Sequence, residues 1–404
     1  MRRTLTITAI AIVLFGGGLF VYFYFFTSTP SEGVTPPDAG GGLPIAPTAG
    51  QQGTPTLGGT SLTPAQIDTP TSISARLVKI SAGPVVKGEV AVDIKAANAS
   101  SSPGVVVNYI ERQSGNIFSY QVGSANLTRI SNKTIPGIET ASWLPNASLA
   151  FVRYLSGTDF STINTYGLPS KGSDGFFLPQ NLADVAVAST SVLVLTSGVN
   201  GSVASRKHID GTPLSTVFSS PLSALRVSFA GKNRYLAFTK PSMTLPGSAF
   251  LVDSTGHFSR ILGPQKGLVA LASPSGKWVL ASFVADDTMR MELVDTATGE
   301  IIPLPVATIT DKCVWAADDS VIYCGIPVSP PTGRNYPDDW YQGAVPFNDR
   351  IWKIQVASRY AQLVLDFPTE ANESLDAEAL AINPKGTVLV FLNKNNGSLW
   401  SYQL

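Results

Sequence analysis

The chain has 404 residues, a length that corresponds to two or three domains of typical size. Its 28 Lys and Arg balance its 28 Asp and Glu, and charged residues make up only 14% of the chain, which argues against a nucleic-acid-binding protein. Hydrophobic residues make up 44%, enough for a large core, while 36 Gly and 29 Pro indicate many turns and few long helices. Two cysteines are too few for a disulfide-rich scaffold or a multi-cysteine metal site.

Residues 5–26 form an uncharged apolar stretch that directly follows Arg2 and Arg3. A helix rises about 1.5 Å per residue, so this stretch is long enough to span the roughly 30 Å hydrocarbon layer of a membrane. The two arginines predict that residues 1–4 stay in the cytoplasm. A cleaved signal peptide is the alternative, but its apolar region is usually shorter and ends in small residues. We expect an uncleaved signal-anchor helix in the bacterial cytoplasmic membrane, with the rest of the chain outside the cytoplasm.

Residues 27–73 are rich in Pro, Gly and Thr, and between positions 31 and 70 only Glu32, Asp38 and Asp68 carry charge. Such a segment buries too little apolar surface to offset its chain entropy. It is therefore predicted to be a flexible linker between the anchor and the domain at 74–404.

Short apolar strands and turns recur from residue 74 onward with a period of about 43 residues. Residues 103–122 are similar to residues 385–404, and both contain Ser-Tyr-Gln in their second strand. Four short strands per repeat predict an all-β fold, a seven-bladed β-propeller. Residues 75–80 are similar to the fourth strand of the first blade, 126–131, so the N-terminal strand is expected to close the last blade. An open array of β-sandwiches is the alternative.

Two recurring patterns resemble the TolB-type, WD-like propeller repeats of bacterial cell-envelope proteins. The first is represented by residues 273–277, Ser-Pro-Ser-Gly-Lys, and the second by Val294, Asp295, Thr298, Gly299 and Glu300. The resemblance covers residues 75–404 and implies a rigid, membrane-anchored propeller that holds partners. It carries over no catalytic residue.

The sequence contains few candidates for catalytic, metal-binding or cofactor-binding residues. His208 and His257 lie about one blade apart, without a nearby Cys or clustered acid, and are interpreted as surface or turn residues. The sequence has no zinc-binding spacing, calcium loop, phosphate loop or Gly-x-Ser-x-Gly elbow. We therefore expect no catalytic residue, no metal and no cofactor.

The two cysteines flank a predicted hairpin that turns at Asp318-Asp319. In a two-residue hairpin, this spacing places Cys313 directly opposite Cys324, within the range of a disulfide. Two buried free thiols are the alternative. The disulfide is the prediction, because the domain is expected in an oxidising compartment.

Blade six has an insertion between its second and third strands, at residues 326–350. In a propeller this loop lies on the top face, near the mouth of the central channel. Large aromatic side chains beside charges are typical of binding surfaces, and the loop contains Tyr336, Asp338, Asp339, Trp340, Tyr341 and Phe347. The alternative is that Trp340 and Phe347 pack against the propeller as a cap. Of these two arrangements we expect a mixture, in which Trp340 packs and Tyr336 and the two aspartates are exposed.

These features together predict a non-catalytic protein-binding or scaffolding module of the cell envelope, with an unidentified envelope protein as partner. A hydrolase or lyase acting on a glycan or peptide at the channel mouth is the alternative, as is a small-ligand sensor. Three or more convergent acids or histidines at the channel favour the enzyme, and Val, Ala and Ser favour the scaffold. The predicted inner strands at 90–94 and 268–272 are apolar, which favours the scaffold.

Overall fold

The computed structural model describes residues 69–95, 104–172 and 174–404, which belong to one compact unit. The predicted anchor at 5–26 and nearly all of the predicted linker at 27–73 lie outside the described residues. No helix in the described part of the chain is long and apolar enough to cross a membrane.

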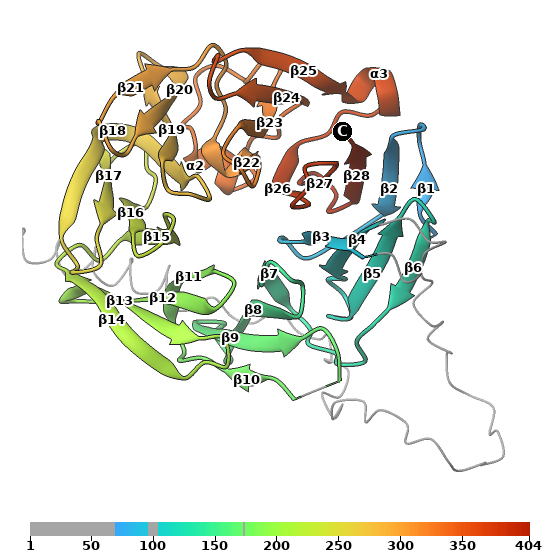
Figure 1. The fold of residues 1–404 in the computed structure, drawn as a ribbon, viewed down its shortest axis with the longest axis horizontal. Helices are drawn as coiled ribbons and strands as arrows, with labels where there is room; N and C mark the ends of the chain where they lie inside the picture. Colours follow the sequence, from blue (N-terminus) through green and yellow to red (C-terminus); the bar gives the residue numbers. More distant parts are fainter. Residues whose placement is uncertain (1–68, 96–103, 173) are drawn as a thin grey trace, which may run out of the picture. The chain divides into compact units, whose positions relative to one another are not determined.

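The described residues form antiparallel sheets arranged around a common centre (Figure 1). Four of these sheets have four strands each. They consist of β3 (Val90–Ile94), β4 (Gly104–Ile110), β5 (Ile117–Val122) and β6 (Asn126–Arg129); of β7 (Ile138–Trp143), β8 (Leu149–Ser156), β9 (Thr162–Pro169) and β10 (Phe176–Phe177); of β11 (Leu182–Val187), β12 (Ser191–Gly198), β13 (Gly201–His208) and β14 (Pro213–Ser220); and of β22 (Cys313–Trp315), β23 (Val321–Pro327), β24 (Asp349–Gln355) and β25 (Ala361–Asp366). The first strand of each sheet lies nearest the centre (Figure 1).

A fifth sheet has seven strands because one long strand belongs to two neighbouring units. It contains β15 (Leu225–Phe229), β16 (Tyr235–Thr239), β17 (Gly247–Val252), β18 (Phe258–Ala272), β19 (Trp278–Ala285), β20 (Thr288–Asp295) and β21 (Ile301–Pro303). The first half of β18 pairs with β17, and its second half, from Lys266, pairs with β19. The strand therefore runs from the rim of one unit to the centre of the next.

The last sheet joins the two ends of the described chain. Its order is β1 (Thr71–Ser72), β2 (Leu77–Ser81), β28 (Leu399–Gln403), β27 (Val388–Asn393) and β26 (Ala377–Ile382). The register pairs Leu77 with Tyr402 and Val78 with Ser401. An N-terminal strand thus completes the C-terminal sheet, as the similarity of residues 75–80 to 126–131 predicts, and closes the ring.

The apolar core is divided into clusters that lie between neighbouring sheets. One cluster, for example, joins Leu193 and Leu195 of β12 to Leu225 of β15 and Tyr235 of β16. An inner strand is covered on both faces, so all six residues of β27 are buried, whereas the rim strand β6 is mostly exposed. This radial packing of antiparallel sheets is that of a β-propeller.

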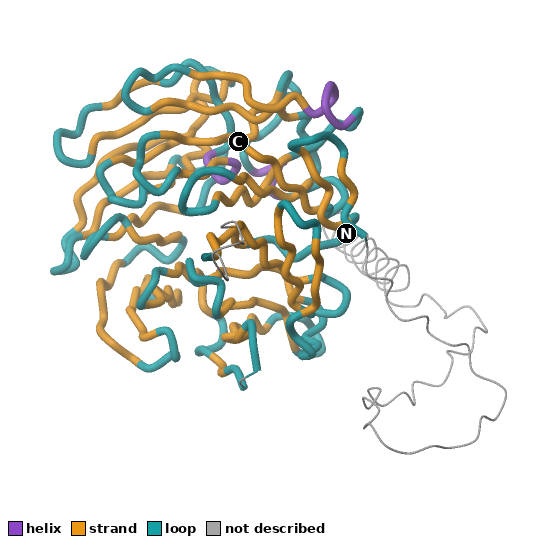
Figure 2. Tube along the Cα trace, turned by 45° about the vertical axis from the view of Figure 1, so that its right-hand side comes forward, coloured by secondary structure: helices purple, strands orange, loops and turns teal. Residues whose placement is uncertain are grey.

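Three short helical segments complete the described part of the chain. The 3₁₀ turn η1 (Thr310–Lys312) directly precedes β22, and α3 (Phe367–Ala371) follows β25. The insertion between β23 and β24 contains α2 (Asp338–Tyr341). Figure 2 shows the same fold as a Cα trace from a second direction, with helices, strands and loops in different colours.

Candidate functional site

Charged side chains gather where the innermost strands begin. The set, called here the inner-strand cluster, consists of Lys87 and Glu89 before β3, Asp184 in β11, Arg226 in β15, Asp311 in η1, Tyr341 in α2 and Glu378 in β26. These residues interact directly or act on each other's ionisation. Five different sheets or their connections therefore contribute polar groups to one place.

The segment before β3 holds two members of the inner-strand cluster against β7. The Ala141 amide donates to the carbonyl of Lys87 at 2.8 Å, and the Trp143 indole donates to the carbonyl of Gly88 at 3.1 Å. Gly88 has a positive φ of 103°, and a Cβ there would lie 1.9 Å from the carbonyl oxygen of Ala141. Only glycine permits this approach, which fixes the positions of Lys87 and Glu89.

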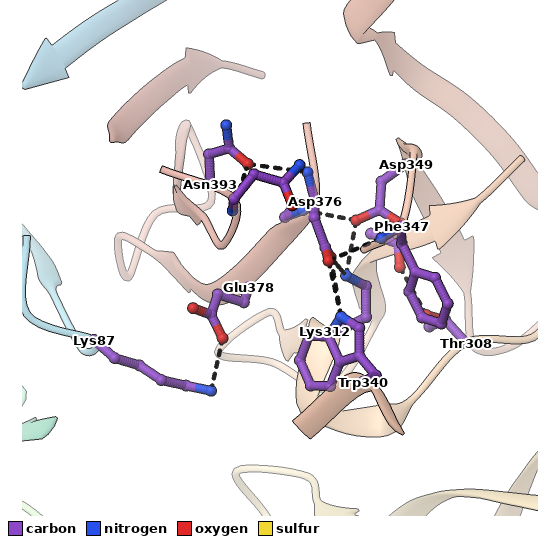
Figure 3. Close-up of polar contacts among 12 residues, drawn as sticks. Lys87, Thr308, Lys312, Trp340, Phe347, Asp349, Asp376, Glu378 and Asn393 are labelled. Atoms are coloured by element: carbon purple, nitrogen blue, oxygen red, sulfur yellow. Dashed lines mark hydrogen bonds and ion pairs between the residues drawn. The ribbon is translucent and has the colours of Figure 1, made fainter. Parts of the chain in front are cut away.

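Lys87 and Glu378 form an ion pair between two innermost strands (Figure 3). Their Nζ and Oε2 atoms are 2.9 Å apart, and the side chains are 38% and 10% exposed, respectively. The pair therefore lies at the edge of the protein interior, where solvent or a ligand can reach the ammonium group.

Glu89 is buried beside this pair, and neither of its carboxyl oxygens has a hydrogen-bond partner within the described structure. Burial raises the pKa of Glu89 well above its usual range, and the charge of Glu378 raises it further. Lys87 and the backbone N–H groups of Gly88 and Glu89 act in the opposite direction without cancelling the effect. Two carboxyl groups in different environments thus lie together, one favouring its protonated form and one ion-paired.

A second chain of polar contacts lies next to the first. Oδ2 of Asp311 accepts hydrogen bonds from the Tyr341 hydroxyl at 2.8 Å and from Nη1 of Arg226 at 2.7 Å. Burial opposes the ionisation of Asp311, but Arg226 and Lys87 outweigh it and lower the pKa of Asp311. Burial, followed by the charge of Asp311, raises the pKa of Tyr341 well above its usual range. Tyr341 therefore keeps its proton while 36% of its surface stays exposed.

Beneath these groups, a fully buried triad fastens the insertion to the propeller (Figure 3). Nζ of Lys312 lies 2.8 Å from Oδ2 of Asp349 and also contacts Oδ1 of Asp376, and all three side chains are inaccessible to solvent. Oδ2 of Asp376 accepts the Trp340 indole N–H and the Phe347 backbone N–H, both at 3.0 Å. One lysine thus faces two carboxyl groups. Burial, followed by the charge of Asp376, raises the pKa of Asp349 to about 6 against the opposing effect of Lys312.

The aromatic side chains of the insertion pack inward. Trp340 and Phe347 are buried, as in the alternative of a cap on the propeller. The expectation that Tyr336 is exposed was wrong: the residue is only 7% exposed. Its hydroxyl donates to the carbonyl of Pro331 at 2.7 Å, and its ring centroid lies 5.3 Å from that of Phe347. A phenol whose hydroxyl finds a local acceptor loses little by being buried.

The polar residues of the insertion have two different placements. Asp338 and Asp339 are half-buried and accept backbone N–H groups, from Met243 at 2.8 Å and from Asn335 at 3.0 Å. Tyr341 alone among the six predicted residues joins the inner-strand cluster. The structure thus brings the insertion to the site but assigns most of its predicted binding residues to packing and loop contacts.

The cysteines and histidines lie elsewhere. Cys313 pairs in register with Cys324 across the β22–β23 hairpin, and their sulfur atoms form a disulfide of 2.13 Å. His208 ends β13 and His257 lies in the turn before β18, both exposed on outer hairpins. Over the described ranges, no group of three or more His, Cys, Asp or Glu residues is placed to hold a metal ion.

Sequence reasoning missed Lys87, Glu89, Arg226, Asp311 and Glu378. It considered the bodies of the inner strands, such as 90–94, which are apolar because neighbouring sheets cover them. Each repeat has one position at or just before the start of its apolar inner strand. A charged residue at that position is the signal by which the sequence could have indicated the site.

Comparisons with known proteins identify the fold. The sequence matches no family profile and no curated protein. Among solved structures, it is similar to oligogalacturonate lyase from Vibrio parahaemolyticus, at 8% identity over 81% of this chain and 93% of that chain, with a TM-score of 0.51. It is also similar to hydrazine synthase from Kuenenia stuttgartiensis, at 10% identity over 74% of this chain and 92% of that chain, with a TM-score of 0.50. The chain is a β-propeller.

These findings correct the prediction of a non-catalytic binding or scaffolding module. Both similar structures are enzymes by name. At the starts of the inner strands, Glu378 acts on the ionisation of Glu89, and Lys87 acts on both Glu89 and Asp311. The apolar strand bodies that suggested a scaffold line the packed interior, whereas the polar groups lie at the strand ends.

Proposed function

We propose that the protein is an enzyme that cleaves glycosidic bonds by acid–base catalysis at the inner-strand cluster. The observation that carries this proposal is the environment of its two glutamates. Glu89 is buried and favours its protonated form, while Glu378 is ion-paired with Lys87 beside it. Most enzymes that break glycosidic bonds use two carboxyl groups, and the different environments of the two keep one protonated and the other ionised.

In this proposal Glu378 acts on the substrate as a base, and its neighbours position the sugar. Glu378 accepts a proton as general base, and Lys87 stabilises its charge. Tyr341 keeps its proton, which it donates in a hydrogen bond to Asp311, so its exposed ring and hydroxyl oxygen serve to position the sugar. Asp311 and Arg226 hold that hydroxyl in place. Glu89, whose oxygens do not reach solvent, interacts with Glu378 through its charge.

A glycan fits these groups better than a peptide does. Peptide cleavage by a protein nucleophile requires a Ser or Cys activated by a base, and both histidines lie on outer hairpins. The exposed ring of Tyr341 offers a flat surface on which a sugar can lie. Oligogalacturonate lyase, which has the same fold, is by its name a lyase of a sugar oligomer.

The test is cleavage by the purified full chain of a panel of neutral and acidic glycans, followed as new reducing ends and as unsaturated sugar products. We expect activity on at least one glycan and a loss of about 100-fold or more in kcat for Glu378→Gln. Glu300→Gln is the matched control, because Glu300 is exposed in the turn between the outer strands β20 and β21, away from the inner-strand cluster. Cleavage of no glycan, or an unchanged rate for Glu378→Gln, would overturn the proposal.

We also infer a finer architecture for the whole chain. If the seven-stranded sheet is divided at β18, each half has four strands, which supports seven blades of the TolB type. The apolar stretch at 5–26 after Arg2 and Arg3 supports a single membrane anchor that places the propeller outside the cytoplasm. Fractionation of cells that express the full chain, with protease added to intact spheroplasts, tests this: a soluble or protease-protected propeller contradicts it.

A further inference from the structure

Exposed apolar side chains gather on one face of three neighbouring units of the ring. The sheets β7–β10 and β11–β14 and the strands β15–β18 follow one another around the centre (Figure 1). In each unit the strands are antiparallel, so the loop between the second and third strands lies at the end where the first strand begins. Three such loops carry Phe160, Val199 and Leu245, and Leu222 lies at the same end, in the connection from β14 to β15. These four residues are called here the apolar tips.

The apolar tips project into solvent. Val199 is completely exposed, Leu245 is 73% and Phe160 67% exposed, and Leu222 is also exposed. Single exposed apolar residues are common on protein surfaces, but here they recur at equivalent places in adjacent units. Their recurrence on one face therefore calls for an occupant of that face.

Hydrogen bonds join the loops that carry the apolar tips. The Ser202 hydroxyl donates to the carbonyl of Leu222 at 2.6 Å, and the backbone N–H of Lys240 donates to the carbonyl of Ala224 at 2.8 Å. The β12–β13 hairpin, the β14–β15 connection and the β16–β17 loop thus form one continuous surface. Phe160 extends this surface to the neighbouring sheet.

The segments that carry the apolar tips are almost uncharged. Only Asp159 and Lys240 are charged among residues 157–161, 199–200, 221–224 and 240–246. Asp159 is engaged in its own turn, where its Oδ1 accepts the Ser161 hydroxyl at 2.9 Å. The loops at the opposite end of the same units carry more charge, with Lys171, Asp174, Asp210, Lys232, Arg234 and Asp253. The face with the apolar tips therefore loses less charge hydration when it leaves water.

The described chain also starts toward this face. β2 ends here, because it is antiparallel to β28, which begins here. In the pairing with β1, Thr71 lies opposite Lys79, one position nearer to this end than Ser72. The 42 residues 27–68 separate this start from the apolar stretch 5–26. A linker of that length has a root-mean-square span of about 35 Å, so a membrane anchor at 5–26 keeps the propeller close to the bilayer.

We propose that the apolar tips dock the propeller on the surface of a phospholipid bilayer. This inference goes beyond the proposed enzyme and rests on the membrane anchor inferred above. A fluid bilayer accepts apolar side chains from separate hairpins without a complementary shape, and each gains free energy by leaving water. Protein interfaces are enriched in aromatic side chains and arginine, whereas the segments of the apolar tips contain one aromatic residue and no arginine. Because charge is scarce here, the docking requires no anionic lipid.

The test uses the full chain reconstituted in phosphatidylcholine vesicles, with a fluorescent probe on one introduced cysteine. Both native cysteines are held in the disulfide, so Val199→Cys provides a single labelling site. We expect a lipid with a nitroxide in its acyl chain to quench this probe, at low and at high salt alike. Ile209→Cys is the matched control, because Ile209 is exposed in the turn between β13 and β14, at the opposite end of the same sheet. Its probe should stay unquenched.

A further variant measures the contribution of the neighbouring tips. Phe160→Ser combined with Leu245→Ser removes two large apolar side chains at exposed positions, where substitutions change stability little. In the labelled Val199→Cys chain, we expect this change to shift the equilibrium at least about tenfold from the docked to the undocked propeller, measured as the quenched fraction of the probe.

The outcomes separate docking from anchoring. A chain that floats with the vesicles in a density gradient, but whose Val199 probe is quenched no more than the Ile209 probe, retains the anchor and overturns docking. A chain that does not float overturns both. Shielding of the Val199 probe that rises with the protein-to-lipid ratio, without quenching by the nitroxide lipid, identifies a second copy as the occupant and overturns the bilayer. Unchanged quenching after Phe160→Ser and Leu245→Ser overturns the assignment to these residues.

Discussion

At the scale of single residues, the buried triad brings together three charged side chains that are far apart in the sequence. Lys312 precedes β22, Asp349 begins β24 and Asp376 precedes β26, so no two of them are neighbours in the chain. Folding brings them together with no solvent access and with one acid in excess. A buried acid in excess favours its protonated form, which explains the direction of the pKa of Asp349.

This residue gives a prediction about stability and pH. The pKa of Asp349 is raised from 3.8 to about 6, so its contribution to stability is fully present below pH 3.8 and is lost as the pH rises through 6. The difference corresponds to about 3 kcal/mol in the free energy of unfolding. Asp349→Asn, which stays neutral, should remove this loss, so that the variant gains on the wild type as the pH rises from 4 to 7.

The measurement is urea unfolding at a series of pH values. Glu89, whose pKa is also raised, contributes in the same direction, so the variant retains part of the pH dependence. Asp287→Asn is the control, because Asp287 is an exposed turn residue with a φ of 55° that suits Asn. If Asp349→Asn keeps the full pH dependence of the wild type, another group is responsible for the titration.

At the scale of elements, the spacing of the two cysteines correctly predicted their pairing across the β22–β23 hairpin. The loop is four residues long, 317–320, where a two-residue turn is predicted, but it is centred on Asp318-Asp319 and therefore keeps the register that places Cys313 opposite Cys324. The insertion that follows β23 was less predictable from its sequence. Its composition suggests an exposed binding loop, but Tyr336, Trp340 and Phe347 form an aromatic group that packs inward.

The disulfide of this hairpin should have a measurable effect. It closes a short loop between residues 11 apart in sequence, for which chain entropy predicts about 3 kcal/mol of stabilisation. We expect a reductant to lower the Tm of the wild type by several degrees and to leave the double variant Cys313→Ala/Cys324→Ala unchanged. Equal thermal unfolding of the wild type with and without reductant, after thiol titration confirms reduction, contradicts this expectation.

At the scale of the whole molecule, the ring is held closed by a pairing between the two ends of the described chain. Leu77 of β2 is fully buried in a cluster with Trp400 and Tyr402 of β28. The guanidinium of Arg76 adds a contact 4.6 Å from the Tyr402 ring, and its Nε donates to the carbonyl of Gln403 at 2.7 Å. Because these contacts join distant parts of the sequence, they stabilise the complete ring and no smaller part of it.

Truncating Leu77, the buried apolar side chain of β2, tests how much this strand contributes to the stability of the ring. Leu77→Ala should lower the free energy of unfolding by 2–5 kcal/mol, roughly the range for a buried leucine. Leu363→Ala, on the rim strand β25 with 41% of the side chain exposed, should change it by less than about 0.5 kcal/mol. Equal effects of the two substitutions in urea unfolding would show that β2 does not close the ring.

The sequence by itself determined the strands, their repeat, the closing strand and the cysteine register. Each depends on alternation, turn residues and spacing, which are local properties of the chain. Only the tertiary structure decided the site, because Lys87, Glu89, Arg226, Asp311 and Glu378 come from separate repeats and carry no motif. The ring alone brings the starts of the innermost strands together, and burial there raises the pKa of Glu89 beside the ion-paired Glu378. Such convergence depends on positions in space, and the order of residues along the chain does not record it.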